Sequence, residues 1–264
     1  MNRFADSACT VRSILSVFKG SGLDSGEILA AAGLSRESSE NPDTRLSIER
    51  IETVWSIGYV ISKDPWLALH AAETLSYGSY GIVDFVCGAA PTVCEAIQRI
   101  CWYFPLINNS VVLAAEKGEK ECALYLGSHV GGLLPPMIDF IFATILLHTR
   151  ECWEMDWAPE RVEFAYPRPK SFKEYERIFR CDLRFEAPIS KIVIPRVFWE
   201  SPLPSSNPDL LKVLEDHAKA LLSQHPPPED SEAKLRSLIG SKLHDGVPCL
   251  KDIAREMGFS VRNL

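Results

Sequence analysis

The sequence predicts an α+β fold: helices packed with a small, mostly antiparallel sheet, followed by a helical tail. Apolar residues recur at helical spacing through most of residues 1–104, which indicates helices with one buried face. Short β-rich stretches bounded by turn residues occur between residues 109 and 195. The chain has 264 residues, 46% of them hydrophobic, which is enough for one large domain with a sizeable core and a small appendage.

Three helices are expected in the first part of the chain. Residues 9–20 are expected to form a helix whose apolar face consists of Val11, Ile14, Leu15 and Phe18. A second, short helix covers 24–33, and Gly33 is its expected C-terminal cap. Ser47 can cap the third helix through its hydroxyl. The apolar stripe of that helix contains Ile51, Val54, Trp55 and Ile61.

Two more helices flank a glycine-rich segment. Asp64 precedes Pro65, a favoured first helical residue, so we expect a helix over 63–75. Residues 76–83, SYGSYGIV, are expected to form a hinge. Residues 90–104 are again helical in pattern, with one face made of Cys94, Ile97, Cys101 and Phe104.

The sheet is predicted to follow. Residues 109–127 form a hairpin around the turn EKGEK, and short strands are expected at 161–169, 183–186 and 191–195. A long buried helix is predicted from about Pro136 to Met155, and a short one over 170–179. A capped helix over 203–224 has Asn207 before Pro208.

The domain boundary is expected where three consecutive prolines, in HPPPED, prevent a helix from continuing. This divides the chain into a body, 1–223, a linker, 224–230, and a tail, 231–264. The whole chain carries −7, but the tail carries six Lys or Arg against four acids. The body is therefore strongly acidic and repelled by phosphate, and only the tail tolerates nucleic acid.

The chain is expected in the cytoplasm, with free thiols and without a membrane span. Its eight cysteines form no C-x-x-C pair, and residues 1–10 do not resemble a secretory signal. The most apolar stretch, 131–150, contains Pro135, Pro136 and Asp139, and its uninterrupted apolar part is too short to cross a bilayer. We therefore expect a buried helix there.

Motifs for catalysis, cofactors or metals are weak. GSGLDSG departs from the spacing of a phosphate-binding loop, and YGSYG fails the spacing of a serine nucleophile elbow. His148 and Cys152 lie four residues apart on a predicted helix, but no second ligand pair has suitable spacing for zinc. We expect no enzyme, no cofactor and no metal.

The tail has the pattern of a helix-turn-helix. Ile253, Ala254 and Met257 form the inner face of one helix, which Gly258 ends. Ser260 can cap a second helix. The residues expected to meet a DNA major groove are Ser260, Val261, Arg262 and Asn263. The alternative is a helical hairpin with a structural role only.

These residues resemble the start of the DNA-binding domain of AraC-type (AraC/XylS) transcription regulators. The matching positions are Pro248, Leu250, Ile253, Ala254, Met257, Gly258, Ser260, Arg262 and Leu264. Asn263 departs, because threonine is usual there. The body resembles the subgroup with an arabinose-binding-like N-terminal effector domain, over residues 75–107 and 161–210, although Tyr166 stands where histidine is common.

The resemblance implies a one-component regulator. Its N-terminal effector domain would sense a small molecule and often form a homodimer, and its C-terminal domain would bind DNA through two helix-turn-helix units. We expect this chain to be truncated inside the first unit, so that DNA binding belongs to a full-length form. The expected architecture is a helix-rich α+β effector domain followed by an incomplete all-α helix-turn-helix segment.

The leading hypothesis is that a small-molecule effector biases how the DNA-binding domain is presented. The effector is expected to be apolar or amphipathic, in an apolar pocket with a few polar groups. The candidate polar contacts are Tyr80, Asn108, Asn109, His148 and Arg150. The alternative is a dimerisation or protein-interaction module without a ligand, and an enzyme is a third possibility.

Overall fold

The computed structural model describes residues 4–41, 44–129 and 132–224 of the chain. The predicted linker, 224–230, lies outside this part except for its first residue, and the predicted helix-turn-helix segment lies wholly outside it. The four residues expected to contact DNA therefore also lie outside the described residues: Ser260, Val261, Arg262 and Asn263. Their assignment stays a prediction.

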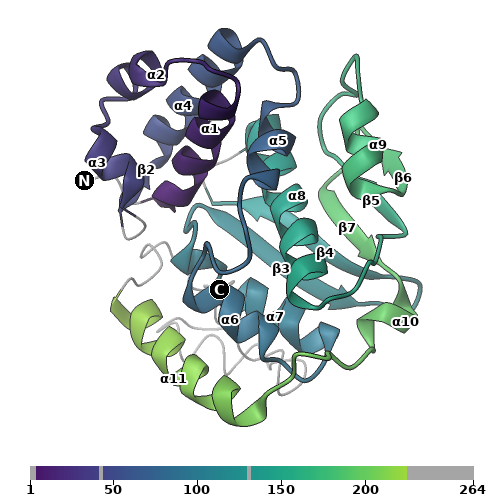
Figure 1. Ribbon diagram of the computed structural model, residues 1–264. Coiled ribbons are helices and arrows are strands. Elements are labelled where there is room, and N and C mark those ends of the chain that lie inside the picture. The colour runs from purple at the N-terminus through teal and green to yellow at the C-terminus, as the bar shows by residue number, and fades with distance from the viewer. Residues whose placement is uncertain (1–3, 42–43, 130–131, 225–264) are drawn as a thin grey trace, which may run out of the picture.

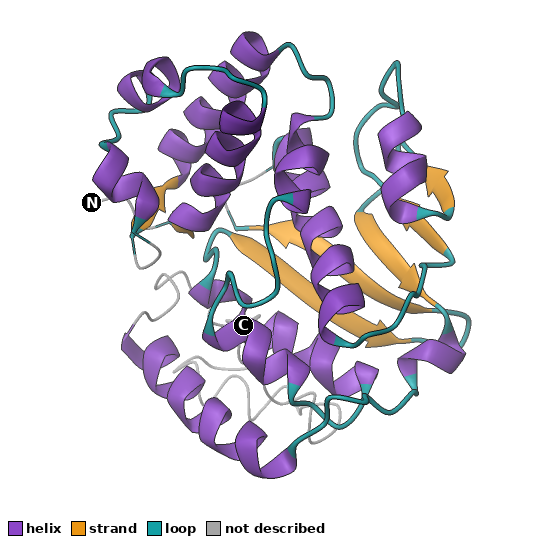
Figure 2. Cartoon of the chain, in the orientation of Figure 1, coloured by secondary structure: helices purple, strands orange, loops and turns teal. Residues whose placement is uncertain are grey.

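The fold is α+β, as predicted. A five-stranded sheet lies behind a long central helix, and a group of N-terminal helices sits beside it (Figures 1 and 2). The N-terminal elements are β1 (Ala5–Ser7), α1 (Ala8–Gly20), α2 (Gly26–Ala31), α3 (Arg36–Glu40), β2 (Arg45–Ser47) and α4 (Ile48–Ser62). β1 and β2 form a separate antiparallel pair.

Local chemistry explains where several of these helices begin and end. The Ser7 hydroxyl accepts a hydrogen bond from the Cys9 backbone N–H at the start of α1, which satisfies one orphan donor. Gly33 follows α2 with φ +62°, the left-handed conformation predicted for this cap. α5 (Leu67–Glu73) begins two residues later than Pro65, and the Asp64 carboxylate accepts from the backbone N–H of Trp66 just before it.

The middle of the chain departs most from the prediction. Residues 76–81 form a tight turn, but α6 (Ile82–Gly88) follows at once, where only a hinge was expected. α7 (Val93–Tyr103) and the 3-10 turn η1 (Phe104–Leu106) come next. On the predicted apolar face of α7, Ile97 is buried, and Cys94 and Cys101 are partly buried and packed against the core.

The five-stranded sheet has the order β3-β4-β7-β5-β6. Its strands are β3 (Val111–Lys117), β4 (Cys122–Ser128), β5 (Arg161–Glu163), β6 (Asp182–Arg184) and β7 (Ser190–Ile194). β3 and β4 form the predicted hairpin, and Val111 pairs with Ser128. All neighbours are antiparallel except β5 and β6, which run parallel. The prediction of a mostly antiparallel sheet is therefore confirmed.

The remaining helices are α8 (Pro135–Cys152), α9 (Lys173–Phe179), α10 (Arg196–Trp199) and α11 (Pro208–Gln224). The long buried helix is confirmed as α8. The predicted cap of α11 is also present, because the Asn207 side-chain oxygen accepts from the Leu210 backbone N–H. Within the described ranges, no helix has the length and apolar character that crossing a bilayer requires.

Helix α8 organises the core. One of its faces points to the sheet and α9, where Phe142 is fully buried with its ring 6.0 Å from that of Phe164. On the same face Asp139 accepts hydrogen bonds from the hydroxyls of Tyr166 and Tyr175. We call this side of α8 the sheet face. The opposite side, which we call the pocket face, looks toward α6, α7 and the N-terminal helices.

Candidate functional site

The pocket face of α8 forms one wall of a cavity, which we call the central pocket. Its volume is about 60 Å³. About 10–15 Å³ of such volume holds one water, so there is room for roughly four or five waters or one small organic molecule. It is lined by Asp6, Thr10, Trp55, Tyr77, Tyr80, Val83, Asp84, Cys87, Ile100, Phe104, Ile107, Asn108, Met137, Phe140, Ile141, Thr144, Ile145, His148, Thr149, Cys152 and Trp153.

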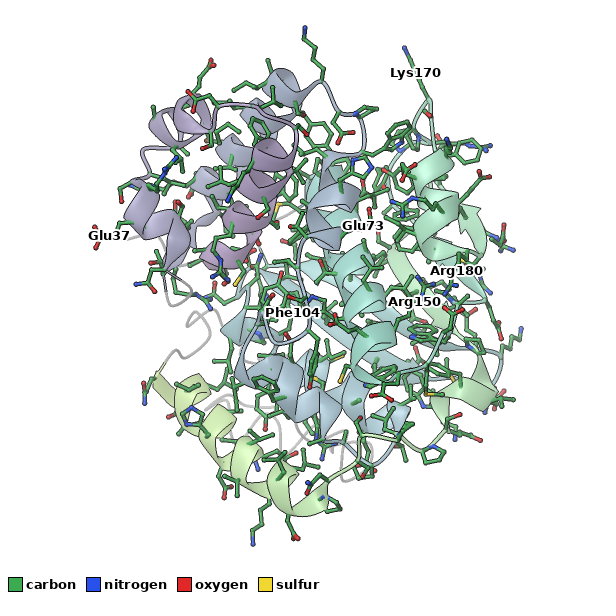
Figure 3. The ribbon with its side chains drawn as sticks, in the orientation of Figure 1. Glu37, Glu73, Phe104, Arg150, Lys170 and Arg180 are labelled. Carbon is green, nitrogen blue, oxygen red and sulfur yellow. The ribbon has the colours of Figure 1, made fainter. Side chains whose placement is uncertain are left out.

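The helical period explains which residues of α8 line the pocket. Its residues recur at spacings of three and four, which place them on one side of a helix: Met137, Phe140, Ile141, Thr144, Ile145, His148, Thr149 and Cys152. Aromatic rings from other elements complete the enclosure. The Trp55 ring of α4 meets that of Phe140 edge to face at 5.5 Å, and Phe104 lies in the middle of the molecule (Figure 3).

Asp84 holds the glycine-rich turn against α8. One oxygen, Oδ2, accepts from the backbone N–H groups of Gly78, at 2.9 Å, and Tyr80, at 3.0 Å. The other, Oδ1, lies 3.3 Å from His148 Nδ1. Gly78 has φ +92° and Gly81 φ +56°, conformations that glycine adopts without strain. The turn thus places the Tyr80 ring 5.7 Å from the His148 ring.

A second carboxyl group enters the pocket from β1. Asp6 is only 4% exposed, and its Oδ2 accepts from the Thr10 hydroxyl at 3.1 Å. Burial raises the pKa of Asp6 to about 7, although Thr10, Arg45 and Asn108 oppose the shift. Burial likewise holds the pKa of Tyr80 well above its usual value, so this phenol stays neutral.

Three buried polar atoms on residues lining the pocket have no hydrogen-bond partner in the described part of the chain. They are Trp55 Nε1, Thr144 Oγ1 and His148 Nε2, on residues that are 1%, 5% and 6% exposed. A buried polar group without a partner costs about 1–3 kcal/mol. Natural proteins satisfy nearly all such groups, so three around one cavity indicate a place where another molecule supplies the partners.

The structure brings three of the five candidate ligand contacts together. Tyr80, Asn108 and His148 all line the central pocket. Asn109 lies outside it, and its side-chain oxygen accepts from the Ala5 backbone N–H at 2.7 Å. These placements define the geometry of the candidate contacts, whose role in binding stays a proposal.

Arg150 points away from the pocket. Its Nε donates to the Trp157 carbonyl at 2.8 Å, and its Nη1 donates to the Ile178 carbonyl at 2.7 Å. Figure 3 shows Arg150 beside Arg180, on the side of the molecule that carries α9. Through these two hydrogen bonds Arg150 connects α8 to the α9 region, which is a structural role.

Sequence reasoning missed Asp6, Thr10, Asp84 and Thr144. Asp84 did carry a signal, because it is the single charged residue in the apolar stretch IVDFVCG, and such a residue is almost never buried without a partner. Asp6 and Thr10 share a helical spacing of four but lie in a mixed polar segment. Nothing in the linear sequence relates them to α8.

The pocket contains His148 and Cys152, the pair considered for a metal. Among the described residues, no group of three or more His, Cys, Asp or Glu side chains is arranged to hold a metal ion. The seven cysteines in this part of the chain are free. Burial raises the pKa of Cys152 to about 11, so its thiol is protonated and a poor ligand at neutral pH.

Fold and pocket together define a regulatory domain of the ligand-binding type. The family model described as the arabinose-binding domain of AraC transcription regulators, N-terminal, matches residues 22–203. The chain therefore belongs to this family, which confirms the resemblance seen over the body. The family consists of transcription regulators and not of enzymes.

Two known proteins are similar to the chain. The ornithine utilization regulator of Pseudomonas aeruginosa is 24% identical over 247 residues, which cover 92% of this chain and 72% of that protein. The crystal structure of the transcriptional regulator CdpR from Pseudomonas aeruginosa aligns with a TM-score of 0.60 at 13% identity. That alignment covers 97% of this chain and 76% of the other, and supports the fold alone.

Proposed function

We propose that the chain is the effector-sensing part of an AraC-type transcription regulator and that the central pocket binds the small-molecule effector. The single observation that carries the proposal is the set of unpartnered buried atoms of Trp55, Thr144 and His148 around one cavity. Tyr80 and Asn108 supply further polar contacts. A protein-interaction module without a ligand would have no reason to keep these atoms unpaired.

The proposed mechanism is a population shift. Helices α6 and α7 both line the pocket, and α6 also packs against α11, the last described element. Arg99 of α7 donates to Glu215 of α11 at 2.8 Å, and the hydroxyl of Ser205, in the segment before α11, donates to the Gly88 carbonyl at the end of α6 at 2.7 Å. An effector that prefers one arrangement of α6 and α7 would therefore bias the position of α11. Residues 225–264 follow α11, so the bias would reach a DNA-binding unit.

DNA binding and homodimerisation are part of the same proposal for the full-length regulator. The residue pattern of 248–264 supports a first helix-turn-helix, in which Ser260, Val261, Arg262 and Asn263 would meet the DNA. For the dimer, the support is α11, where Val213 is 66% exposed and Leu210 is 48% exposed. Val213→Glu should lower the dimer fraction in light scattering, whereas Lys212→Glu, a neighbouring exposed change, should not.

The test is a ligand screen by native mass spectrometry and thermal shift. One relative is named for ornithine utilization, so amino acids and related small metabolites are the first class to screen. Binding should raise the melting temperature with concentration. Thr144→Met, which fills the pocket, should abolish the shift, whereas the exposed substitution Ser16→Met should keep it. If no compound binds the wild type, or if Thr144→Met binds equally well, the proposed site is wrong.

A further inference from the structure

We propose that the central pocket selects a small cationic ligand, an alkylammonium compound, over neutral or anionic molecules of the same shape. This inference rests on the proposed function and adds the chemical class of the effector. It follows from the charge of the lining, the free hydrogen-bond acceptors and the aromatic walls.

The lining is acidic. Its carboxyl groups are those of Asp6 and Asp84, and no lysine or arginine lines the pocket. Burial raises the pKa of Asp6 to about 7, so this carboxyl group is partly ionised at neutral pH, and a bound cation would favour its charged form. Of the nearby cations, Arg45 is directed to backbone carbonyls, including that of Pro105 at 3.2 Å, and Arg12 Nη2 lies 2.7 Å from Cys9 Sγ. A carboxylate or phosphate ligand would thus meet like charge in a poorly solvated site, where repulsion is strong.

The pocket residues offer acceptors that an ammonium group can use. An alkylammonium head group has three N–H donors and no acceptor, so it can partner Thr144 and His148, whereas the Trp55 Nε1–H donor needs an acceptor elsewhere on the ligand. Asp84 Oδ1 has only the 3.3 Å contact with His148, although a carboxylate can accept several hydrogen bonds. If His148 Nδ1 carries the proton toward Asp84, its unpartnered Nε2 is an acceptor. The unpartnered Thr144 Oγ1 lies one helical turn away on the same face of α8.

Aromatic rings surround these acceptors. Trp55, Tyr80, Phe104 and Phe140 all line the pocket. The negative face of an aromatic ring attracts a desolvated cation, and the same ring packs well against an alkyl chain. Acidic groups within aromatic walls therefore favour a cation with an apolar part over a neutral polar molecule. The volume of about 60 Å³ restricts that ligand to a small molecule unless side chains move.

The test compares three four-carbon probes: butylamine, butanol and butyrate. At pH 7.5 the amine is protonated, because ordinary amine pKa values are near 10. We expect ligand-observed NMR and calorimetry on the whole chain to show binding in the order butylamine, butanol, butyrate. If butanol or butyrate binds best, the inference is wrong while the proposed function stands. If none of the three binds, the inference is wrong, and the metabolite screen alone decides the proposed function.

A pair of matched variants tests whether the negative charge of Asp6 attracts the cationic ligand. Asp6→Asn keeps the side-chain oxygen that accepts from the Ser7 backbone N–H but removes the negative charge. It should weaken butylamine binding about tenfold, the loss of one charge-assisted contact, and leave butanol binding unchanged. Asp209→Asn makes the same charge change on an exposed residue and should alter neither. Equal loss for the amine and the alcohol, or no loss in either variant, would overturn the inference.

Asp84→Asn provides a second test of the charge. Its fold must be checked, because Asp84 also holds the turn through Gly78 and Tyr80. Its amide oxygen can keep those two hydrogen bonds. Far- and near-ultraviolet circular dichroism first establishes that the variant is folded. Selective loss of amine binding in the folded variant supports the cationic class, and full retention of amine binding in both Asp6→Asn and Asp84→Asn contradicts it.

Discussion

The two faces of helix α8 bury polar groups in opposite ways. On the sheet face, Asp139 accepts from the hydroxyls of Tyr166 and Tyr175, so its two oxygens both have partners. On the pocket face, Thr144 Oγ1 and His148 Nε2 have none among the described residues. Both faces belong to one helix and are equally inaccessible to water, so burial alone does not explain the difference.

The contrast separates a structural cluster from a candidate binding site. A satisfied buried network rigidifies the core and specifies its packing. An unsatisfied one lowers stability, and proteins keep such local violations mainly where function requires them. We therefore expect substitutions on the sheet face to change stability without changing ligand response. Those on the pocket face should change ligand response at little or no cost in stability.

The largest effect is expected from Phe142→Ala on the sheet face. This ring is fully buried against Phe164, and its removal leaves a cavity. The free energy of unfolding should fall by about 3–5 kcal/mol, measured by urea denaturation. Phe85→Ala, at a ring that is 46% exposed, serves as the matched control with a clearly smaller loss. Equal losses in the two variants would break the assignment of this face to the core.

A smaller effect is expected where α6 approaches the pocket. A Cβ on Gly88 would lie 2.3 Å from the Tyr77 hydroxyl oxygen and 2.6 Å from Cys152 Sγ, so both side chains must move. Gly88→Ala should cost about 1–3 kcal/mol, as overpacking does, and also alter probe binding, because Tyr77 and Cys152 line the pocket. Gly20→Ala, whose Cβ would meet nothing within 4 Å, should leave probe binding unchanged.

The pH dependence of stability tests the sheet face again. Burial raises the pKa of Asp139 to about 7 in the folded protein, despite the two tyrosine hydroxyls. A raised carboxyl pKa stabilises the fold fully below the ordinary pKa near 4, and that stability is lost as the pH rises toward 7. Asp139→Asn should therefore reduce the fall in stability between pH 5 and pH 8, measured by denaturation at both values. A steeper fall would contradict the sign of this shift.

The smallest effect is expected on the pocket face itself. Thr144→Val replaces an unpartnered hydroxyl by a methyl group of similar shape. Because it removes a buried unpaired group, thermal and urea unfolding should show a change between zero and a gain of about 1 kcal/mol. Butylamine binding should nevertheless weaken. A clear loss of stability would mean that the hydroxyl already has a partner in the free protein.

The sequence predicted long helices better than short ones. It predicted which face of a helix is buried better than which of two adjacent residues enters the pocket. α8 was predictable because its apolar run is long, whereas α6 has only seven residues and begins directly after Gly81, too short for a clear period. Asn108 lines the pocket while the adjacent Asn109 turns to the Ala5 backbone. His148 and Arg150, two residues apart on a helix, necessarily point in opposite directions.

The contacts that define the pocket lie beyond the reach of a linear pattern. Asp84 and His148 are 64 residues apart, and Asp6 reaches the pocket only because β1 is fixed beside the Asn108 segment by a backbone bridge. The helical period did place His148 on a buried face. Which buried face carries unpaired polar groups depends on packing with α1, α6 and α7, which no local spacing records.

The most direct test of the two-face account is methyl NMR on the whole chain with isoleucine labelling. Ile141 and Ile145 report on the pocket face, Ile178 reports on α9, and Ile192 of β7 reports on the sheet. Butylamine, butanol and butyrate are titrated in turn. We expect saturable shifts of the Ile141 and Ile145 methyl groups, largest with butylamine, while Ile178 and Ile192 stay in place. Shifts of the sheet-face methyl groups alone, or of none with any probe, would contradict it.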